Sequence, residues 1–193
     1  MILNSISISD SASEMEMLAA RELQKYCQQM TGAEIPLRFS GESEADTDGV
    51  LLIGLPSTNH HIDTLVRSRK IRNPDRNLKP EGFIIETLID GGLAKLVITG
   101  RDPKGMLNGV YHLLQEVFGV GFFRDGQRVP TRENLTVPEL SIASSPRFSI
   151  RGELLWGYLG PQRFCSSSWP LERWQAAIDW QAQKKMNTIE ISL

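Results

Sequence analysis

The sequence has few cysteines, almost no net charge and no long apolar run. Cys27 and Cys165 are the two cysteines in 193 residues, too few for a disulfide framework, and a reducing compartment is the simpler interpretation. A formal net charge of −2 gives no electrostatic reason to expect nucleic acid or an anionic membrane as a partner. The longest apolar stretches, such as residues 119–123, are far too short to span a bilayer. We therefore expect a globular protein in water.

Motifs for metals and cofactors are also missing, so no cofactor and no metal are expected. His60 and His61 are adjacent and lack the i, i+4 spacing of a helical metal site. Residues 119–124 lack the third glycine of a dinucleotide loop and lead out of a predicted helix rather than into one. Because no basic n-region or apolar h-region opens the sequence, the expected location is cytoplasmic, or secreted or periplasmic if a leader was removed.

The first part of the chain alternates the patterns of strands and helices. Residues 5–9 alternate strictly between serine and isoleucine, which predicts a half-buried strand. Ser13 and Glu16 have the spacing of a capping box, and Gly32 suits the left-handed residue after a helix. These signals predict a helix from about Ser13 to Gly32 with one buried face.

Four further strands are indicated. Residues 35–39 contain Pro36, which favours an edge or first position, whereas the apolar run at 50–53 is typical of a central strand. Two strand-like runs, 82–88 and 94–99, flank an Asp-Gly-Gly sequence at 90–92. Glycine supplies the positive φ that a tight turn requires, so this segment predicts a β-hairpin.

A second helix is predicted over residues 104–118 by an apolar stripe at helical spacing, formed by Met106, Val110, Leu113, Leu114 and Val117. Gly105 and Gly109 lie four residues apart on it and are expected to permit close packing against the sheet. The polar stretch 57–80 is locally basic, and we interpret it as a solvated helix and loop in preference to a binding patch. Its cations are Arg67, Arg69, Lys70, Arg72, Arg76 and Lys79.

The character of the sequence changes after Pro146. Residues 138–146 combine two prolines with small residues and are interpreted as a linker. Half of the aromatic residues, including all 4 tryptophans, follow it. Patterns at 148–156, 171–186 and 188–193 predict a strand, a helix and a strand. The expected fold class is α/β: a layered sheet with two main helices over residues 1–143, then an incomplete βαβ segment over residues 144–193.

Several segments, in order, resemble the N-terminal halves of large glycoside hydrolases. The most specific is residues 100–115, Gly-Arg-Asp-Pro-Lys-Gly-Met-Leu-Asn-Gly-Val-Tyr-His-Leu-Leu-Gln, followed by Gly-Val-Gly-Phe-Phe at 119–123. Residues 146–152 are similar to the first barrel strand of β-hexosaminidases, and residues 169–187 look like the entry helix of α-N-acetylglucosaminidases or α-glucuronidases. The resemblance implies a non-catalytic N-terminal domain that precedes a (β/α)₈ barrel, of which residues 144–193 would be the start.

The resemblance also implies where carbohydrate would bind. An arginine at the place of Arg151 holds sugar hydroxyls in the hexosaminidases, and a guanidinium fork suits vicinal hydroxyls or a uronate. Glu153 and Glu190 are the nearby carboxylates of interest, although Glu153 could simply pair with a neighbouring base. Trp156 could stack on a sugar ring. No catalytic residue is expected here, because the acids of these enzymes lie on later barrel strands.

The predicted function is that of the N-terminal accessory part of a glycoside hydrolase acting on oligo- or polysaccharides, inactive alone. Its expected partner is a carbohydrate substrate bound through the missing barrel, with no nucleic acid and no membrane. The alternative is a stand-alone carbohydrate-binding or protein-interaction module, and a nucleotide-binding α/β protein is a weaker third possibility. The oligomeric state, the sugar and the linkage are left open.

Overall fold

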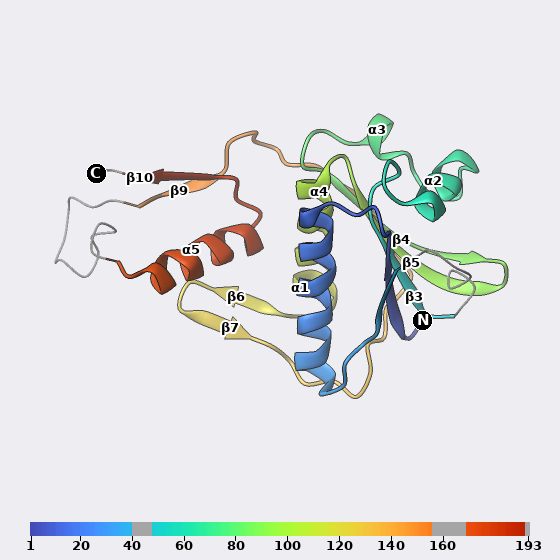
Figure 1. The fold of residues 1–193 in the computed structure, drawn as a ribbon, viewed down its shortest axis with the longest axis horizontal. Helices are drawn as coiled ribbons and strands as arrows, with labels where there is room; N and C mark the ends of the chain where they lie inside the picture. The colour runs from blue at the N-terminus through green and yellow to red at the C-terminus, as the bar shows by residue number, and fades with distance from the viewer. Residues whose placement is uncertain (40–47, 156–168, 192–193) are drawn as a thin grey trace. The chain divides into compact units, whose positions relative to one another are not determined.

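The computed structural model describes residues 1–39, 48–155 and 169–191 (Figure 1). Contacts divide the chain into two compact units. Unit 1 comprises Met1–Val120 and Val129–Pro146, and unit 2 comprises Gly121–Arg128 and Arg147–Leu193. Within the described ranges, no helix is both long and apolar enough to cross a membrane.

Unit 1 is built on a six-stranded mixed sheet with the order β2-β1-β3-β5-β4-β8. Strands β2, β1, β3 and β5 run parallel, and β4 and β8 are antiparallel to their neighbours. The strands are β1 (Ser5–Ile8), β2 (Leu37–Phe39), β3 (Val50–Ile53), β4 (Phe83–Asp90), β5 (Leu93–Gly100) and β8 (Ser141–Ser144). The α/β class predicted from the sequence is confirmed, with β3 in the centre and β2 at the edge after Pro36.

Helix α1 (Glu14–Thr31) begins and ends where its capping residues predict. The backbone N–H of Ser13 donates to Oε2 of Glu16 at 2.8 Å, and the N–H of Glu16 donates to Oγ of Ser13 at 3.4 Å, which completes a capping box. Gly32 has φ +74° and donates its N–H to the carbonyl of Gln28. The apolar face of α1, including Leu23 and Tyr26, is fully buried.

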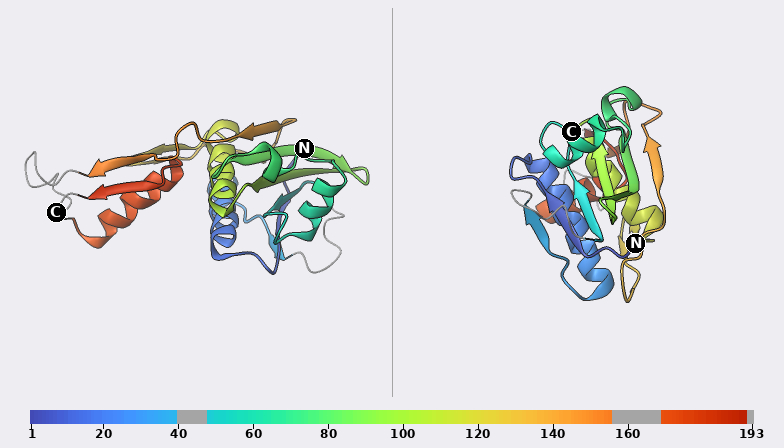
Figure 2. Two further views of the ribbon diagram at one scale, coloured as in Figure 1. Left: turned by 90° about the horizontal axis from the view of Figure 1, so that it is seen from above. Right: turned by 90° about the vertical axis from the view of Figure 1, so that its right-hand side faces the viewer.

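Helices cover both faces of the sheet (Figures 1 and 2). Helices α1 and α4 (Pro103–His112) pack together on one face. Helix α2 (His60–Arg67) and the short α3 (Pro74–Asn77) lie on the other face. Ile62 and Leu65 of α2 join a buried cluster with Val50, Leu52, Ile71 and Val97. The stretch interpreted as solvated therefore has one face in the core.

The predicted hairpin and the close approach of α4 are both confirmed. Asp90 pairs with Leu93 across a two-residue turn in which Gly91 and Gly92 have φ +61° and +82°, the turn geometry that only glycine adopts readily. A Cβ on Gly105 would lie 2.2 Å from the carbonyl oxygen of Gly82, and one on Gly109 would lie 3.0 Å from Ile98. Helix α4 therefore rests directly on the backbone of the neighbouring segment.

The second predicted helix, residues 104–118, is divided in two. It continues from α4 as a π-helical turn, η2 (Leu113–Val117), in which the N–H of Phe118 donates to the carbonyl of Leu113. Gly119, with φ +76°, follows the turn. Arg132 supports this end by donating from Nη2 to the carbonyl of Phe118 at 2.9 Å.

Two sequence-based interpretations of unit 1 were wrong. The strand at residues 5–9 is not half-buried: Ser5 and Ser7 are 5% and 2% exposed, because β1 lies between two parallel strands with both faces covered. Residues 138–146 are not simply a linker, since Ser141–Ser144 pair with Phe83–Glu86 as the antiparallel edge strand β8. An edge strand is held by backbone hydrogen bonds on one side and needs no run of buried apolar residues. The short sequence of β8 therefore has no hydrophobic pattern from which a strand could be predicted.

Unit 2 contains the βαβ segment indicated by the sequence. Strands β9 (Gly152–Leu155) and β10 (Thr188–Ile191) are parallel, and α5 (Leu171–Gln183) connects them. An unpredicted hairpin, β6 (Gly121–Phe123) with β7 (Gly126–Arg128), belongs to the same unit and contacts α5. Several large apolar side chains of unit 2 are exposed, with exposed fractions of 74% for Ile150, 67% for Leu171 and 65% for Phe148.

Candidate functional site

The carbohydrate-site residues predicted from the sequence lie on and around the β9–β10 pair. Glu153 is opposite Ile189 in the parallel register, and Glu190 is opposite Leu154. Successive residues of a strand point to opposite faces, and opposed residues of paired strands share a face. Glu153 and Glu190 therefore lie on opposite faces of the sheet. They cannot act as a pair of catalytic carboxyls on one sugar.

The two faces of this strand pair differ in exposure. Gly152, Thr188 and Glu190 are exposed, whereas Glu153 and Ile189 on the other face are half-buried. Nη1 of Arg124 donates a hydrogen bond to Oε1 of Glu153 at 2.7 Å and forms an ion pair with it. The side chain of Glu153 is 26% exposed and that of Arg124 is 57% exposed. Glu153 thus ties β9 to the β6–β7 hairpin, and Glu190 is the carboxylate on the open face.

Arg151 precedes β9 and bonds to backbone carbonyls. Its Nε donates to the carbonyl of Lys185 at 2.9 Å, and its Nη1 donates to that of Phe148 at 2.7 Å. Its own backbone N–H donates to Oδ1 of Asn187 at 2.9 Å, and its carbonyl accepts from the N–H of Asn187 at 2.7 Å. In this arrangement the guanidinium fixes the segments that lead into β9 and β10.

Trp156, the aromatic residue predicted to stack on sugar, lies outside the described residues. The other three predicted residues, Arg151, Glu153 and Glu190, lie on the β9–β10 pair or just before it, and the structure gives each a different set of contacts. The partner of Glu153 could not be found from the sequence, because Arg124 lies 29 residues away in a separate hairpin and no local pattern pairs the two. In the parts of the chain that the structure describes, no cluster of His, Cys, Asp and Glu could hold a metal ion.

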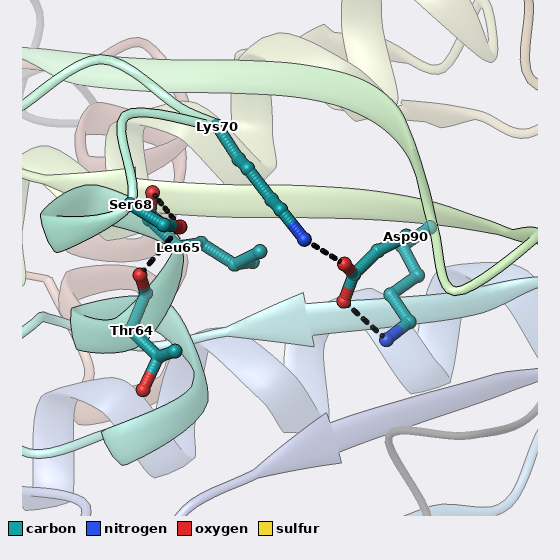
Figure 3. A network of polar contacts seen from close by, with 6 residues as sticks. Thr64, Leu65, Ser68, Lys70 and Asp90 are labelled. Atoms are coloured by element: carbon teal, nitrogen blue, oxygen red, sulfur yellow. Dashed lines mark hydrogen bonds and ion pairs between the residues drawn. The ribbon is translucent and has the colours of Figure 1, made fainter.

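Unit 1 has polar chemistry that the sequence did not reveal, on the face that carries α2. Asp90 bonds to Lys70 and, at 3.0 Å, to Nζ of Lys95 (Figure 3). The Lys95 side chain is only 4% exposed, and its counter-ion is Asp90, whose side chain is 24% exposed. Hydrogen bonds from Lys70 and then Lys95 lower the pKa of Asp90 below its usual value.

Arg72 and Glu86 form a second ion pair on this face. Nε of Arg72 lies 2.5 Å from Oε1 of Glu86, and the backbone N–H of Arg72 donates to the other carboxylate oxygen at 3.1 Å. Nη2 of Arg72 reaches Oγ of Ser141 on β8 at 3.0 Å. This arginine connects the segment after α2 with the two outer strands of the sheet.

Comparison with solved structures shows the same fold. A family GH115 4-O-methyl-α-glucuronidase with specificity for decorated arabinogalactans aligns over 98% of this chain and 25% of its own, with 15% identity and a TM-score of 0.69. A Streptomyces plicatus β-hexosaminidase aligns over 100% and 31%, with 17% identity and a TM-score of 0.58. A GH138 enzyme targeting pectin rhamnogalacturonan II aligns over 96% and 18%, with 15% identity and a TM-score of 0.58.

The chain thus spans a third or less of the length of each of these enzymes. None of the curated proteins matches it. The family match is to the sequence of unit 1: residues 1–113 match the family described as "Glycosyl hydrolase family 67 N-terminus". This segment contains α1, the central strands and α4, and it makes up more than half of the 193 residues. The chain therefore belongs to the family of N-terminal domains of glycosyl hydrolase family 67.

Proposed function

We propose that this chain is the N-terminal accessory domain, with the first part of the catalytic domain, of an enzyme that hydrolyses glycosidic bonds in oligo- or polysaccharides. The observation that carries the proposal is the family match over residues 1–113. The structural likeness adds that similar folds make up 25% and 31% of the chains of two glycoside hydrolases. An α-glucuronoside is the first substrate to test, because the GH115 relative is an α-glucuronidase.

The part of unit 2 from Arg147 onward is proposed to be the start of the catalytic barrel, with the domain division close to the expected 143–144, at the end of β8. A parallel strand pair needs cover on both faces, and the face with Gly152, Thr188 and Glu190 is exposed. In a (β/α)₈ barrel one strand face points to the interior and the other meets the helices. We assign the exposed face to the barrel interior, which would place Glu190 toward the substrate and leave Glu153 and Arg151 in positioning roles.

This assignment explains why the chain is proposed to be inactive alone. Glycoside hydrolysis requires two carboxyls about 5–9.5 Å apart on the two sides of one bond. Glu153 and Glu190 lie on opposite faces of the β9–β10 pair and do not meet this requirement. The catalytic acids are therefore proposed to come from strands that follow β10.

The test reads the native gene past Leu193 and compares this chain with the full-length protein of that gene. Both are assayed on 4-nitrophenyl glycosides, among them an α-glucuronide, and on a glucuronic-acid-decorated arabinogalactan, with product analysis. We expect hydrolysis by the longer protein and none by the 193-residue chain. A reading frame that stops after Leu193, or a longer protein with no activity on any glycoside, would contradict the proposal.

We also propose a cytoplasmic location. Cys27 is a free, buried thiol, and burial raises its pKa to about 12. A buried free thiol is compatible with a reducing compartment and does not require one. Fractionation of cells that express the native gene tests the location. Recovery of the protein outside the cytoplasm, with a shortened N-terminus, would contradict it.

A further inference from the structure

A groove of about 800 Å³ opens on the α2 face of unit 1. Helix α2 covers the central strands β3 and β5, where its apolar residues meet Leu52 and Val97. Over the outer strands β4 and β8 there is no such helix among the described elements (Figure 1). The segment from Val66 to Asn77 forms one wall of this opening, and residues of β4 and the stretch 139–141 form the other.

The lining of this groove is strongly cationic. Five basic side chains line it, Arg67, Arg69, Lys70, Arg72 and Arg76, against two acidic ones, Glu86 and Glu139. The whole chain has a formal charge of −2. The positive charge is therefore a local property of this surface, and we call it the basic groove.

Three of the five cations have acidic partners. Arg67 pairs with Asp63, Lys70 with Asp90 and Arg72 with Glu86. Arg69 and Arg76 are exposed and are found in no ion pair in the described structure. Their guanidinium groups are thus available to a ligand in the groove that Arg72 and Glu86 also line.

The position of Arg69 is unusual for an arginine. After α2, the N–H of Lys70 donates to the carbonyl of Leu65 and that of Arg69 to Val66, which is the pattern of a Schellman motif. The residue at the position of Arg69 is left-handed, here with φ +60°, and glycine is favoured there. The charge of Arg69 suits the C-terminal end of α2, its backbone conformation is less favourable than that of glycine, and its side chain adds a cation to the lining of the groove.

We propose that the basic groove binds a carboxylate-bearing oligosaccharide, that is, a glycan segment containing uronic acid residues. A guanidinium presents a planar fork of N–H donors that matches a carboxylate, and repeated uronates would meet more than one arginine. The choice of a glycan over another polyanion rests on the proposed function. The affinity of the groove for carboxylates does not depend on it.

Binding is measured by isothermal titration calorimetry of the 193-residue chain at low salt. The probe is a short oligogalacturonate, and its matched control is the same oligosaccharide with every carboxyl group reduced to an alcohol. We expect binding of the acid form only, and weaker binding as sodium chloride is raised. No binding of the acid form, or equal binding of the reduced form, would overturn the proposal. Equal or tighter binding of polyglutamate would indicate an acidic protein partner instead.

Two double variants locate the site. Arg69→Gly/Arg76→Ala removes the two cations without acidic partners, and it is expected to raise the Kd about tenfold or more because two charge-assisted contacts are lost. Arg21→Ala/Lys25→Ala removes the same charge from α1, on the other face of the sheet, and should change the Kd less than about twofold at moderate salt. If both double variants weaken binding equally, the oligosaccharide responds only to the net charge of the protein, and the proposal of a site in the basic groove is overturned.

Folding is followed separately by thermal unfolding. Glycine suits the left-handed position, so Arg69→Gly alone should keep or raise the midpoint while it weakens binding. Unchanged binding by this stable variant would remove Arg69 from the site. If the groove binds the acid form and the longer protein has no glycosidase activity, the proposed function fails and the groove assignment stands.

Discussion

Glu16 shows how one side chain joins two parts of unit 1. It is fully buried, closes the capping box with Ser13, and accepts from the N–H of Leu55 at 3.0 Å and from Oγ1 of Thr58 at 2.5 Å. The carboxylate therefore holds the start of α1 to the loop that follows β3. The capping box could be predicted from the sequence spacing, but the contact with Leu55 depends on the packing of α1 beside β3.

Replacement of Glu16 by alanine is expected to lower the free energy of unfolding by about 2–3 kcal/mol, because a cap is lost and a buried N–H is left without an acceptor. Glu16→Gln keeps one acceptor and should lower it less. Urea unfolding followed by circular dichroism measures both. Glu14→Ala, an exposed change in the same helical turn, is the control, and an equal loss in the control would contradict this role.

Asp90 makes the stability of unit 1 depend on pH. Its pKa is lowered in the folded protein by Lys70 and Lys95, so the unfolded chain binds the proton more readily. The stabilisation is therefore complete above the unfolded pKa of about 3.9 and is lost as the pH falls through the folded value. Lys95 is 4% exposed and has Asp90 as its acidic partner.

We expect Asp90→Asn to lower the free energy of unfolding by about 1–3 kcal/mol at neutral pH, because a charge-assisted bond to a buried lysine is weakened. The difference from the native sequence should shrink as the pH falls below 4. Denaturant unfolding over a pH series measures it, with the exposed Asp10→Asn as control. A difference that stays constant with pH would show that the charge of Asp90 is not the cause.

At the scale of elements, the contact between α4 and the sheet depends on glycine. Gly105→Ala would improve helix propensity, yet its Cβ would meet the carbonyl oxygen of Gly82 at 2.2 Å. We expect a net loss of about 1–3 kcal/mol in the free energy of unfolding, because backbone on both sides resists displacement. Gln29→Ala, an exposed helical change in α1, measures propensity alone. A stabilised Gly105→Ala protein would refute the close contact.

Elements with strong local signals could be predicted from the sequence. Helix α1, the central strand β3 and the Gly91-Gly92 turn could each be predicted from local residues. These are the capping residues of α1, the continuous apolar run of β3 and two glycines with positive φ. The β6–β7 hairpin pairs locally around Asp125-Gly126, but its strands have only three residues each and carry little strand pattern. Strand β8 could not be predicted, because its short sequence is held by backbone pairing with a partner distant in the sequence. For the same reason, the sequence gives no sign that Arg124 meets Glu153.

The candidate site shows the same limit. The sequence named Arg151, Glu153, Trp156 and Glu190 through a family resemblance, and strand alternation then divides Glu153 from Glu190. The basic residues between 67 and 79 were visible in the sequence. That they line a groove together with residues of β4 and β8 depends on the order of the strands in the sheet. Charge alone did not distinguish a solvated loop from a groove.

The two units of the whole molecule differ in how completely their sheets are covered. Unit 1 has a core of fully buried side chains on both faces of its sheet. Unit 2 has a two-stranded sheet with one exposed face, and large apolar residues such as Ile150 and Phe148 are exposed. Parallel sheets normally have both faces covered, so unit 2 is proposed to need more chain than these 193 residues supply.

Hydrogen exchange of the 193-residue chain, read by mass spectrometry, tests this claim most directly. We predict slow exchange in α1, β3 and β5 of unit 1, and exchange faster by orders of magnitude in β9, α5 and β10, because few buried contacts oppose local opening there. In the full-length protein of the native gene, the same unit 2 segments should become protected. Protection of β9, α5 and β10 equal to that of α1 in the short chain would contradict the account.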